Sequence, residues 1–268
     1  MKKYVILGGA GLIGSGIAKR LAEDAENRVF TFDEQKNHSL STSVTQITGS
    51  VLDEGDLQKL CESVEDSSGD LVGVISCVAA NEKSAKKLIE ELENPNRFQL
   101  DILGENRIES WRNSEQKSFE EALKINCVGP DNLLKKLLPQ LSTSRSCSVV
   151  LVASVYGMKP PKQEVFYSEA YFNFKAPGYS VSKAGLIAYA EYLATIFKGT
   201  AIRVNVISPG AIENNHSDEF KRKYSDLTTS NRMGTVADVV NGVEFLLSEK
   251  SDYLNGTNLV IDGGWLVN

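Results

Sequence analysis

The sequence predicts an α/β fold in which one doubly wound parallel sheet is covered by helices on both faces. Short β-branched runs recur along the 268 residues, and amphipathic stretches alternate with them. These runs carry apolar residues on both faces, which is typical of strands in a parallel sheet covered by helices on both sides. With 41% hydrophobic residues, no repeat and no low-complexity linker, the chain is expected to form a single domain over residues 1–268.

The expected strands are, in chain order, YVIL, RVFTF, VTQIT, LVGVIS, SVVLVAS, IRVNVIS and NLVID. Helices are expected over residues 14–24, 54–65, about 179–197 and about 235–247, and a further helical segment after LVGVIS. Three excursions interrupt this alternation, at about 82–117, 158–176 and 213–231. Because ligands of doubly wound sheets lie beyond the carboxyl ends of the strands, such excursions are where substrate specificity is expected.

Composition excludes several classes of function. The formal charge of −6 comes from intermixed acids and bases, which argues against a nucleic-acid or membrane surface. The densest basic run, residues 221–223, is expected to be a solvated helix face. The four cysteines show no metal-ligand spacing, so no metal site is expected and the thiols are predicted to be free. No signal peptide or membrane-spanning stretch is expected, which favours a cytoplasmic protein.

A glycine-rich turn follows the first strand and opens onto the first helix. Its glycines are Gly8, Gly9, Gly11 and Gly14, and Leu12 and Ile13 lie between the last two. Glycine allows both a tight turn and the close approach of a pyrophosphate to backbone N–H groups at a helix N-terminus. A glycine-rich turn without a ligand remains the alternative interpretation of this stretch alone.

Asp33 comes at the end of the second strand, about 20 residues beyond the glycines, where an acid binds the ribose hydroxyls of NAD. A carboxylate there repels the 2′-phosphate of NADP, and neither Ser15 nor Glu34 supplies the arginine that NADP usually requires. NAD is therefore preferred over NADP.

A second set of polar residues is expected at the same edge of the sheet. Tyr179 and Lys183 are four residues apart, so a helix places both on one face. Ser154 ends the strand SVVLVAS, and Asn126 begins an apolar helical run. The Y-x-x-x-K spacing by itself is equally typical of a surface helix, and the neighbouring residues are what favour a catalytic site.

The ordered set of glycines, Asn126, Ser154, Tyr179, Lys183 and the pair Pro209-Gly210 resembles the short-chain dehydrogenase/reductase family. The resemblance extends to NGTNLVIDGGW and implies a Rossmann-like domain that forms homotetramers or homodimers. The long, aromatic segment between Ser154 and Tyr179 is similar to the subgroup associated with flagellin modification and surface-glycan biosynthesis.

The resemblance implies roles for individual residues. Tyr179 is the general acid/base, Lys183 lowers its pKa, Ser154 holds the substrate oxygen, and Asn126 anchors a water beside Lys183. The remaining residues are expected to contact the cofactor: Gly8, Gly11, Leu12, Ile13, Gly14, Asp33, Ser50, Val51, Cys77, Val78, Ala79, Pro209, Gly210, Ile212 and Asn214. Tyr179 and Lys183 are also expected to contact it.

This chain departs from the family pattern at a few positions. VISCVAA replaces an asparagine-containing motif, so Cys77, Val78 and Ala79 are expected to act through their backbone, and Ser50-Val51 replaces an Asp-Val pair. Trp265 is expected to pack at a subunit contact.

The predicted function is NAD-dependent interconversion of a secondary alcohol and a ketone on a small, sugar-derived molecule. The aromatic residues of 158–176 either stack on sugar rings or pack against protein. Two alternatives stay open: an NADPH-dependent reductase of 3-oxoacyl or other carbonyl compounds, and a non-catalytic nucleotide-binding scaffold or sensor.

Overall fold

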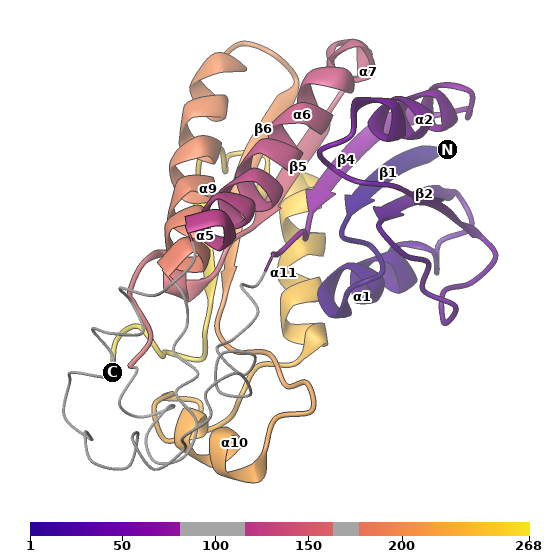
Figure 1. Ribbon diagram of the computed structural model, residues 1–268. Coiled ribbons are helices and arrows are strands. Elements are labelled where there is room, and N and C mark those ends of the chain that lie inside the picture. The colour runs from indigo at the N-terminus through magenta and orange to yellow at the C-terminus, as the bar shows by residue number, and fades with distance from the viewer. Residues whose placement is uncertain (81–115, 163–176) are drawn as a thin grey trace.

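The computed structural model describes residues 1–80, 116–162 and 177–268, and it confirms the predicted parallel sheet (Figure 1). Seven strands are hydrogen-bonded in the order β3-β2-β1-β4-β5-β6-β7, and every neighbouring pair is parallel. The strands are β1 (Lys2–Leu7), β2 (Asn27–Asp33), β3 (Val44–Thr48), β4 (Asp70–Ser76), β5 (Cys147–Val152), β6 (Ile202–Pro209) and β7 (Asn258–Ile261). Each coincides with one of the runs that the sequence marks as a strand.

Helices cover both faces of the sheet. The α-helices are α1 (Leu12–Leu21), α2 (Glu54–Glu65), α5 (Gln116–Leu123), α6 (Gly129–Lys136), α7 (Leu138–Thr143), α9 (Pro177–Ile196), α10 (Asp218–Ser225) and α11 (Val236–Leu247). Shorter helical turns are η2 (Lys124–Val128), η3 (Val155–Gly157) and η4 (Glu249–Ser251). Apolar side chains of α2, α6, α7 and α9 form one core with the sheet, and those of α1 and α11 form the core on the opposite face.

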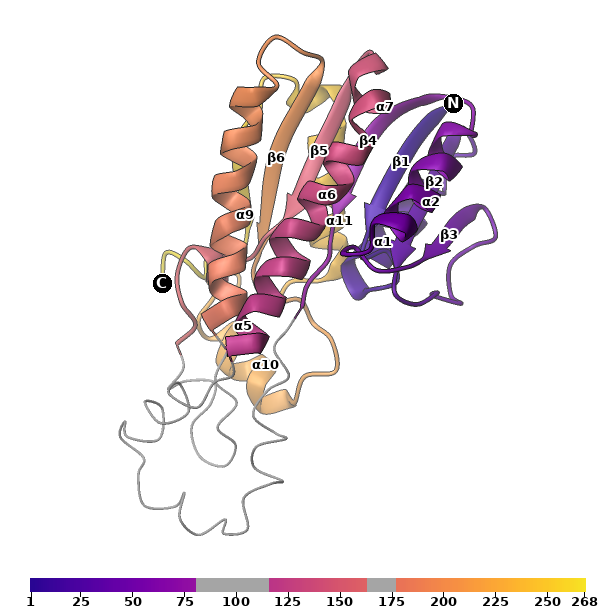
Figure 2. The ribbon, with the colours of Figure 1, turned by 45° about the horizontal axis from the view of Figure 1, so that its top comes forward.

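The strand order places a topological switch at the centre of the sheet. The chain builds β1, β2 and β3 in one direction and then returns to add β4 on the other side of β1. At such a point the segments that follow the two central strands diverge, which opens a crevice above their carboxyl ends. Figures 1 and 2 show α10 at this end of the sheet.

Two of the three predicted excursions fall largely outside the described residues. These are 82–117 and the aromatic segment 158–176, with its rings at 166–174. The third, 213–231, contains α10. Its basic run is neutralised on the helix surface, since Lys221 pairs with Glu213, Arg222 with Asp226 and Lys223 with Glu219. The prediction of a solvated helix face is confirmed.

Trp265 is buried inside its own chain and does not form part of an exposed surface. Its side chain is 2% exposed and belongs to a small third core with Val155, Tyr224 and Met233. The prediction of a subunit contact is therefore wrong for this side chain. The tail turns back beneath η3, where Lys159 Nζ donates to the carbonyl oxygens of Leu266 and Asn268.

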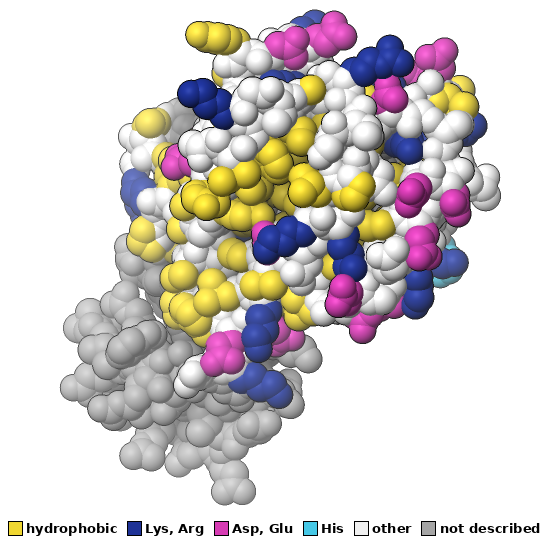
Figure 3. Space-filling model, turned by 90° about the horizontal axis from the view of Figure 1, so that it is seen from above, with side chains coloured by type: hydrophobic (Ala, Val, Ile, Leu, Met, Phe, Trp, Pro, Cys, Tyr) yellow, Lys and Arg dark blue, Asp and Glu magenta, His cyan; other side chains and the backbone are white. Residues whose placement is uncertain are grey.

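The surface carries both signs of charge. Seen from above, basic and acidic side chains are interspersed around a central group of hydrophobic ones (Figure 3). Cys61, Cys77, Cys127 and Cys147 are all free, as predicted. Within residues 1–80, 116–162 and 177–268, no helix is long and apolar enough to cross a bilayer and no cluster of side chains has the make-up of a metal site.

Candidate active site

The glycine-rich turn connects β1 to α1 and packs against the end of β4. Gly8 has a φ of +72°, and a Cβ there would lie 2.8 Å from the backbone of Cys77 and Val78. A Cβ on Gly14 would collide with the carbonyl oxygen of Gly8. These two glycines are therefore required by the turn itself, because no side chain fits between its backbone segments.

Gly11 is different, because a side chain would fit there. A Cβ there would be 3.4 Å from its nearest neighbour, the Gly8 carbonyl oxygen, which is an ordinary contact. Gly11 is also the N-cap residue of α1, and no described side chain caps that helix. By contrast, Asp53, Ser217 and Thr235 cap α2, α10 and α11.

The first turn of α1 therefore offers backbone N–H groups without side-chain acceptors at a positive helix end. Leu12 is 42% exposed there, and the first turn holds no acidic residue that would repel an anion. This arrangement fits the pyrophosphate of a dinucleotide.

Asp33 lies where the sequence predicts, at the carboxyl end of β2. Its Oδ2 accepts a hydrogen bond from the Ala10 N–H at 3.0 Å, which fixes the carboxylate beside the glycine-rich turn. Asn37 reinforces this arrangement, since its Nδ2 donates to the Ala10 carbonyl at 3.0 Å. The half-exposed carboxylate is thus held in a position suited to binding a ribose.

Ser50 and Val51 follow β3 at the same edge. The Ser50 N–H donates to Asp56 Oδ2 at 3.1 Å, and Val51 is buried against Gly129. Asp56, in the first turn of α2, therefore orients the turn in which the sequence places a serine rather than an aspartate.

Lys183 lies buried beneath the ends of two central strands. Its side chain is 2% exposed, and Nζ donates to the carbonyl oxygens of Val152 at 2.9 Å and Val78 at 3.2 Å. The ammonium is 5.7 Å from the ring centre of Tyr179. The predicted convergence of a phenol and an ammonium on one helix face is present, one turn apart in α9.

Burial raises the pKa of the Tyr179 phenol, and a hydrogen bond with Ser154 acts in the opposite direction. The Lys183 ammonium lies 5.7 Å from the ring centre and donates to two backbone carbonyls. The Ser154 hydroxyl is a second group beside the phenol, and its hydrogen bond favours the phenolate.

Ser154 is positioned by the turn that follows β5. It is the N-cap residue of η3, and its Oγ accepts the Tyr156 N–H at 3.2 Å. This bond leaves the hydroxyl proton available to the Tyr179 oxygen, and the side chain is 8% exposed. The serine and the tyrosine, 25 positions apart in the sequence, thus form one hydrogen-bonded pair.

Asn126 holds the backbone on both sides of the site. Its Oδ1 accepts the Ala80 N–H at 2.7 Å, and its Nδ2 donates to Ser182 Oγ at 2.9 Å. Ser182 Oγ donates in turn to the Tyr179 carbonyl oxygen at 2.8 Å. Asn126 is fully buried at the centre of η2, a π-helical turn, which is a distortion often found at functional sites.

The residues expected at the other end of the cofactor follow β6. Pro209 ends the strand, and the Gly210 N–H donates to Ile261 of β7 at 2.9 Å. Ile212 is half-buried and pairs with Gly234, whereas Asn214 is exposed and donates its N–H to His216.

Sequence reasoning missed two residues of this region. Ser182 joins Asn126 to the backbone of Tyr179, and Tyr224 accepts the Ala211 N–H at 2.7 Å. The position of Ser182, three residues after Tyr179 in the same helix, was an available signal. No local pattern marks Tyr224, because its partner lies in the turn after β6.

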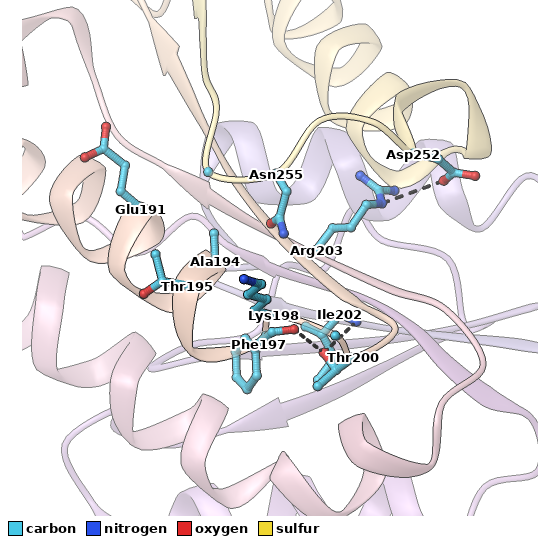
Figure 4. Close-up of a pocket in the computed structure, with 12 residues that line it drawn as sticks. Glu191, Ala194, Thr195, Phe197, Lys198, Thr200, Ile202, Arg203, Asp252 and Asn255 are labelled. Atoms are coloured by element: carbon cyan, nitrogen blue, oxygen red, sulfur yellow. Dashed lines mark hydrogen bonds and ion pairs between the residues drawn. The ribbon is translucent and has the colours of Figure 1, made fainter.

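A pocket of about 650 Å³ opens at the opposite, amino end of β6 (Figure 4). It lies between the last turn of α9 and the loop before β7, and Arg203 at its edge is engaged with Asp252 and with the carbonyl oxygens of Ser251 and Leu246. Because it is remote from Tyr179 and from the carboxyl ends of the strands, it is not the candidate active site.

Comparison with known proteins agrees with this geometry. The family model described as Enoyl-(Acyl carrier protein) reductase matches residues 103–266, and the one described as NAD dependent epimerase/dehydratase family matches residues 4–96. A 3-oxoacyl-[acyl-carrier-protein] reductase of Bos taurus is 31% identical over 76% of this chain and 83% of its own. The uncharacterized oxidoreductase YmfI of Bacillus subtilis is 23% identical over 98% of both chains.

Among solved structures, the chain is similar to a short chain dehydrogenase from Leptospira borgpetersenii with bound NAD⁺. The TM-score is 0.80 at 25% identity, with 98% of this chain and 92% of that chain covered.

Gly11→Ala tests the anion site directly. The folded state accommodates the methyl group, so Tm stays within about 2 °C of the wild-type value. If the pyrophosphate binds at this helix N-terminus, a methyl group on its N-cap residue crowds it. We then expect NADH to bind about tenfold to a hundredfold more weakly, since hydrogen bonds to charged groups contribute about 1.5–3 kcal/mol. NADH fluorescence titration measures the effect, and unaltered affinity would contradict the assignment of the site.

Proposed function

Since the chain belongs to the short-chain dehydrogenase/reductase family, we propose that it is an NAD-dependent oxidoreductase that interconverts a secondary alcohol and a ketone with Tyr179 as general acid/base. One observation carries this proposal. The Tyr179 phenol is hydrogen-bonded to Ser154 and lies beside the buried Lys183 ammonium, at the same sheet edge as the uncapped helix end of α1.

The proposed chemistry assigns one task to each side chain. In the oxidative direction, the Tyr179 oxygen accepts the hydroxyl proton of the alcohol, and in the reductive direction it returns that proton to the carbonyl oxygen. The single Ser154 hydroxyl proton is donated to the Tyr179 oxygen in the free protein, which favours the phenolate, and to the substrate oxygen once substrate is bound. Lys183 places a positive charge beneath the ring. Asn126 bonds Ala80 and Ser182, which fixes the position of α9 relative to the segment that follows β4.

The nicotinamide cofactor, when bound, supplies or accepts the hydride. We assign its pyrophosphate to the first turn of α1, its adenosine ribose to Asp33, and its adenine side to Ser50 and Val51. We assign the backbone of Cys77, Val78 and Ala79 to the middle of the cofactor, and Pro209, Gly210, Ile212 and Asn214 to its nicotinamide end. NAD bound to the Leptospira relative and the carboxylate of Asp33 both support NAD rather than NADP.

For the substrate, we propose a sugar-derived metabolite of surface-glycan synthesis. Support comes from the aromatic composition of residues 158–176, most of which lie outside the described residues. A second candidate is a 3-oxoacyl-type carbonyl compound, which is favoured by the 31% identity to a protein named as a 3-oxoacyl-[acyl-carrier-protein] reductase. Assay of a panel of sugar nucleotides against 3-oxoacyl thioesters distinguishes the two.

We also propose that the chain forms a homodimer or homotetramer. Helix α9 exposes Val181, Tyr192 and Ile196, which are 46%, 62% and 56% accessible and lie along one side of the helix. Light scattering is expected to give two or four times the chain mass of 29.3 kDa, and Ile196→Lys is expected to lower it. A wild-type mass of one chain would contradict this proposal.

Tyr179→Phe removes the group that transfers the proton and little else. We expect kcat to fall by about 10²- to 10⁴-fold, because this is the usual contribution of general acid–base catalysis, while NADH binds as in the wild type. Tyr253→Phe, a change at a fully exposed tyrosine, serves as the control. Unaltered turnover in Tyr179→Phe would refute the assignment and favour the scaffold alternative.

The pH dependence of alcohol oxidation provides a second measurement of the same pair. Oxidation needs the phenolate, so kcat rises with pH through the pKa of Tyr179. Because the hydrogen bond with Ser154 lowers that pKa, Ser154→Ala is expected to move the rise to higher pH. A profile that stayed in place, or moved to lower pH, would show that Ser154 does not stabilise the phenolate.

Asp33→Asn tests the cofactor preference. The amide oxygen still accepts the Ala10 N–H, but the negative charge that repels a 2′-phosphate is lost. We expect the ratio of kcat/KM for NADPH to that for NADH to rise about tenfold or more. Glu34→Gln is the matched control for loss of one charge at the neighbouring position, and an equal change in both variants would remove the role given to Asp33.

A further inference from the structure

Five aromatic rings join α10 to the turn that carries Ser154. They are defined here as the ring row: His216, Phe220, Tyr224, Trp265 and Tyr156. The first three are spaced four residues apart, with His216 just before α10 and the other two within it, and successive ring centres are 4.7 and 6.2 Å apart. Tyr224 stacks on Trp265 at 6.4 Å, and Trp265 meets Tyr156 edge-on at 5.7 Å.

Tyr224 does more than pack in this row. Its side chain is 1% exposed, and its hydroxyl oxygen accepts the Ala211 N–H at 2.7 Å. The hydroxyl also fills the space above Gly210, where a Cβ would lie 2.8 Å from it and 3.1 Å from the Asp262 Cα. This one oxygen therefore contacts two consecutive residues of the turn after β6, Gly210 and Ala211.

From this contact, and resting on the proposed function, we infer that Tyr224 is a positioning residue that sets the backbone against which the nicotinamide end of the cofactor is held. Its hydrogen bond joins α10 to Ala211, directly between Gly210 and Ile212, two of the residues assigned to that end of the cofactor.

Other contacts make this connection rigid. The chain between Ala211 and α10 is tied to the helix by the 2.6 Å ion pair of Glu213 with Lys221. On the far side of the turn, the Gly234 N–H donates to the Ala211 carbonyl at 3.0 Å. Ala211 thus has both its backbone groups bonded, one to Tyr224 and one to the segment that leads into α11, and a shift of α10 moves this turn.

The phenol of Tyr224 stays protonated over the working range of the enzyme. Burial raises its pKa to about 12, although the Ala211 N–H acts to lower it. The hydrogen bond should therefore not change with pH near neutrality, unlike the behaviour proposed for Tyr179. A pH profile separates the two tyrosines.

Tyr224→Phe removes the acceptor and keeps the stacked ring. We expect NADH to bind about fivefold to tenfold more weakly, because one buried N–H loses its partner next to the binding site. The pH at which kcat rises should stay as in the wild type. In the cofactor-free protein, amide hydrogen exchange at Ala211 should become faster, which reports the hydrogen bond without any turnover.

Trp265→Phe is the matched comparison, since it damages the same row without touching the bond to Ala211. We expect it to lower Tm more than Tyr224→Phe does and to weaken NADH binding less. Tyr253→Phe should match the wild type in every measurement.

The outcomes separate this inference from the function on which it rests. A wild-type chain that binds neither NADH nor NADPH overturns both. If the wild type binds NADH and Tyr224→Phe binds it equally well, only the inference is overturned. It is also overturned if Trp265→Phe weakens NADH binding as much as Tyr224→Phe does. The ring row would then affect binding only through the stability of the fold, and not through the hydrogen bond to Ala211.

Discussion

The site depends on one buried charge. An ammonium that is almost fully removed from water is costly to bury unless it is hydrogen-bonded. Lys183 meets this requirement by donating to the carbonyl of Val152, which ends β5, and to that of Val78, two residues beyond β4. These two strands are neighbours in the sheet, so one side chain reaches both oxygens. The same bonds that solvate the charge fix the N-terminal part of α9, and with it Tyr179, against the sheet edge.

Asn126 completes this arrangement from the other side. Its amide bonds the backbone beyond β4 and, through Ser182, the backbone of Tyr179. The side chain of Asn126 thereby aligns two segments that approach from distant parts of the chain.

The two ends of the crevice are built by different means. The end to which we assign the pyrophosphate is made of backbone, where glycines and the first turn of α1 offer N–H groups without a side-chain cap. The other end relies on side chains, because Tyr224 and Trp265 support the turn after β6 and the turn after β5 from below.

The sequence by itself determined the parallel sheet, the helices and the positions of Asp33, Ser154, Tyr179 and Lys183, because apolar periodicity and spacing along the chain are local properties. It also placed these residues at one edge, since parallel strands end together. It did not determine the hydrogen bond by which Ser154 favours the phenolate, nor that Trp265 is buried within its own chain. Ser182 and Tyr224 were likewise revealed only by tertiary structure. Their partners lie far away in sequence or in a separate element, and a hydrogen bond across such a distance is decided by packing, which leaves no periodic trace in the sequence.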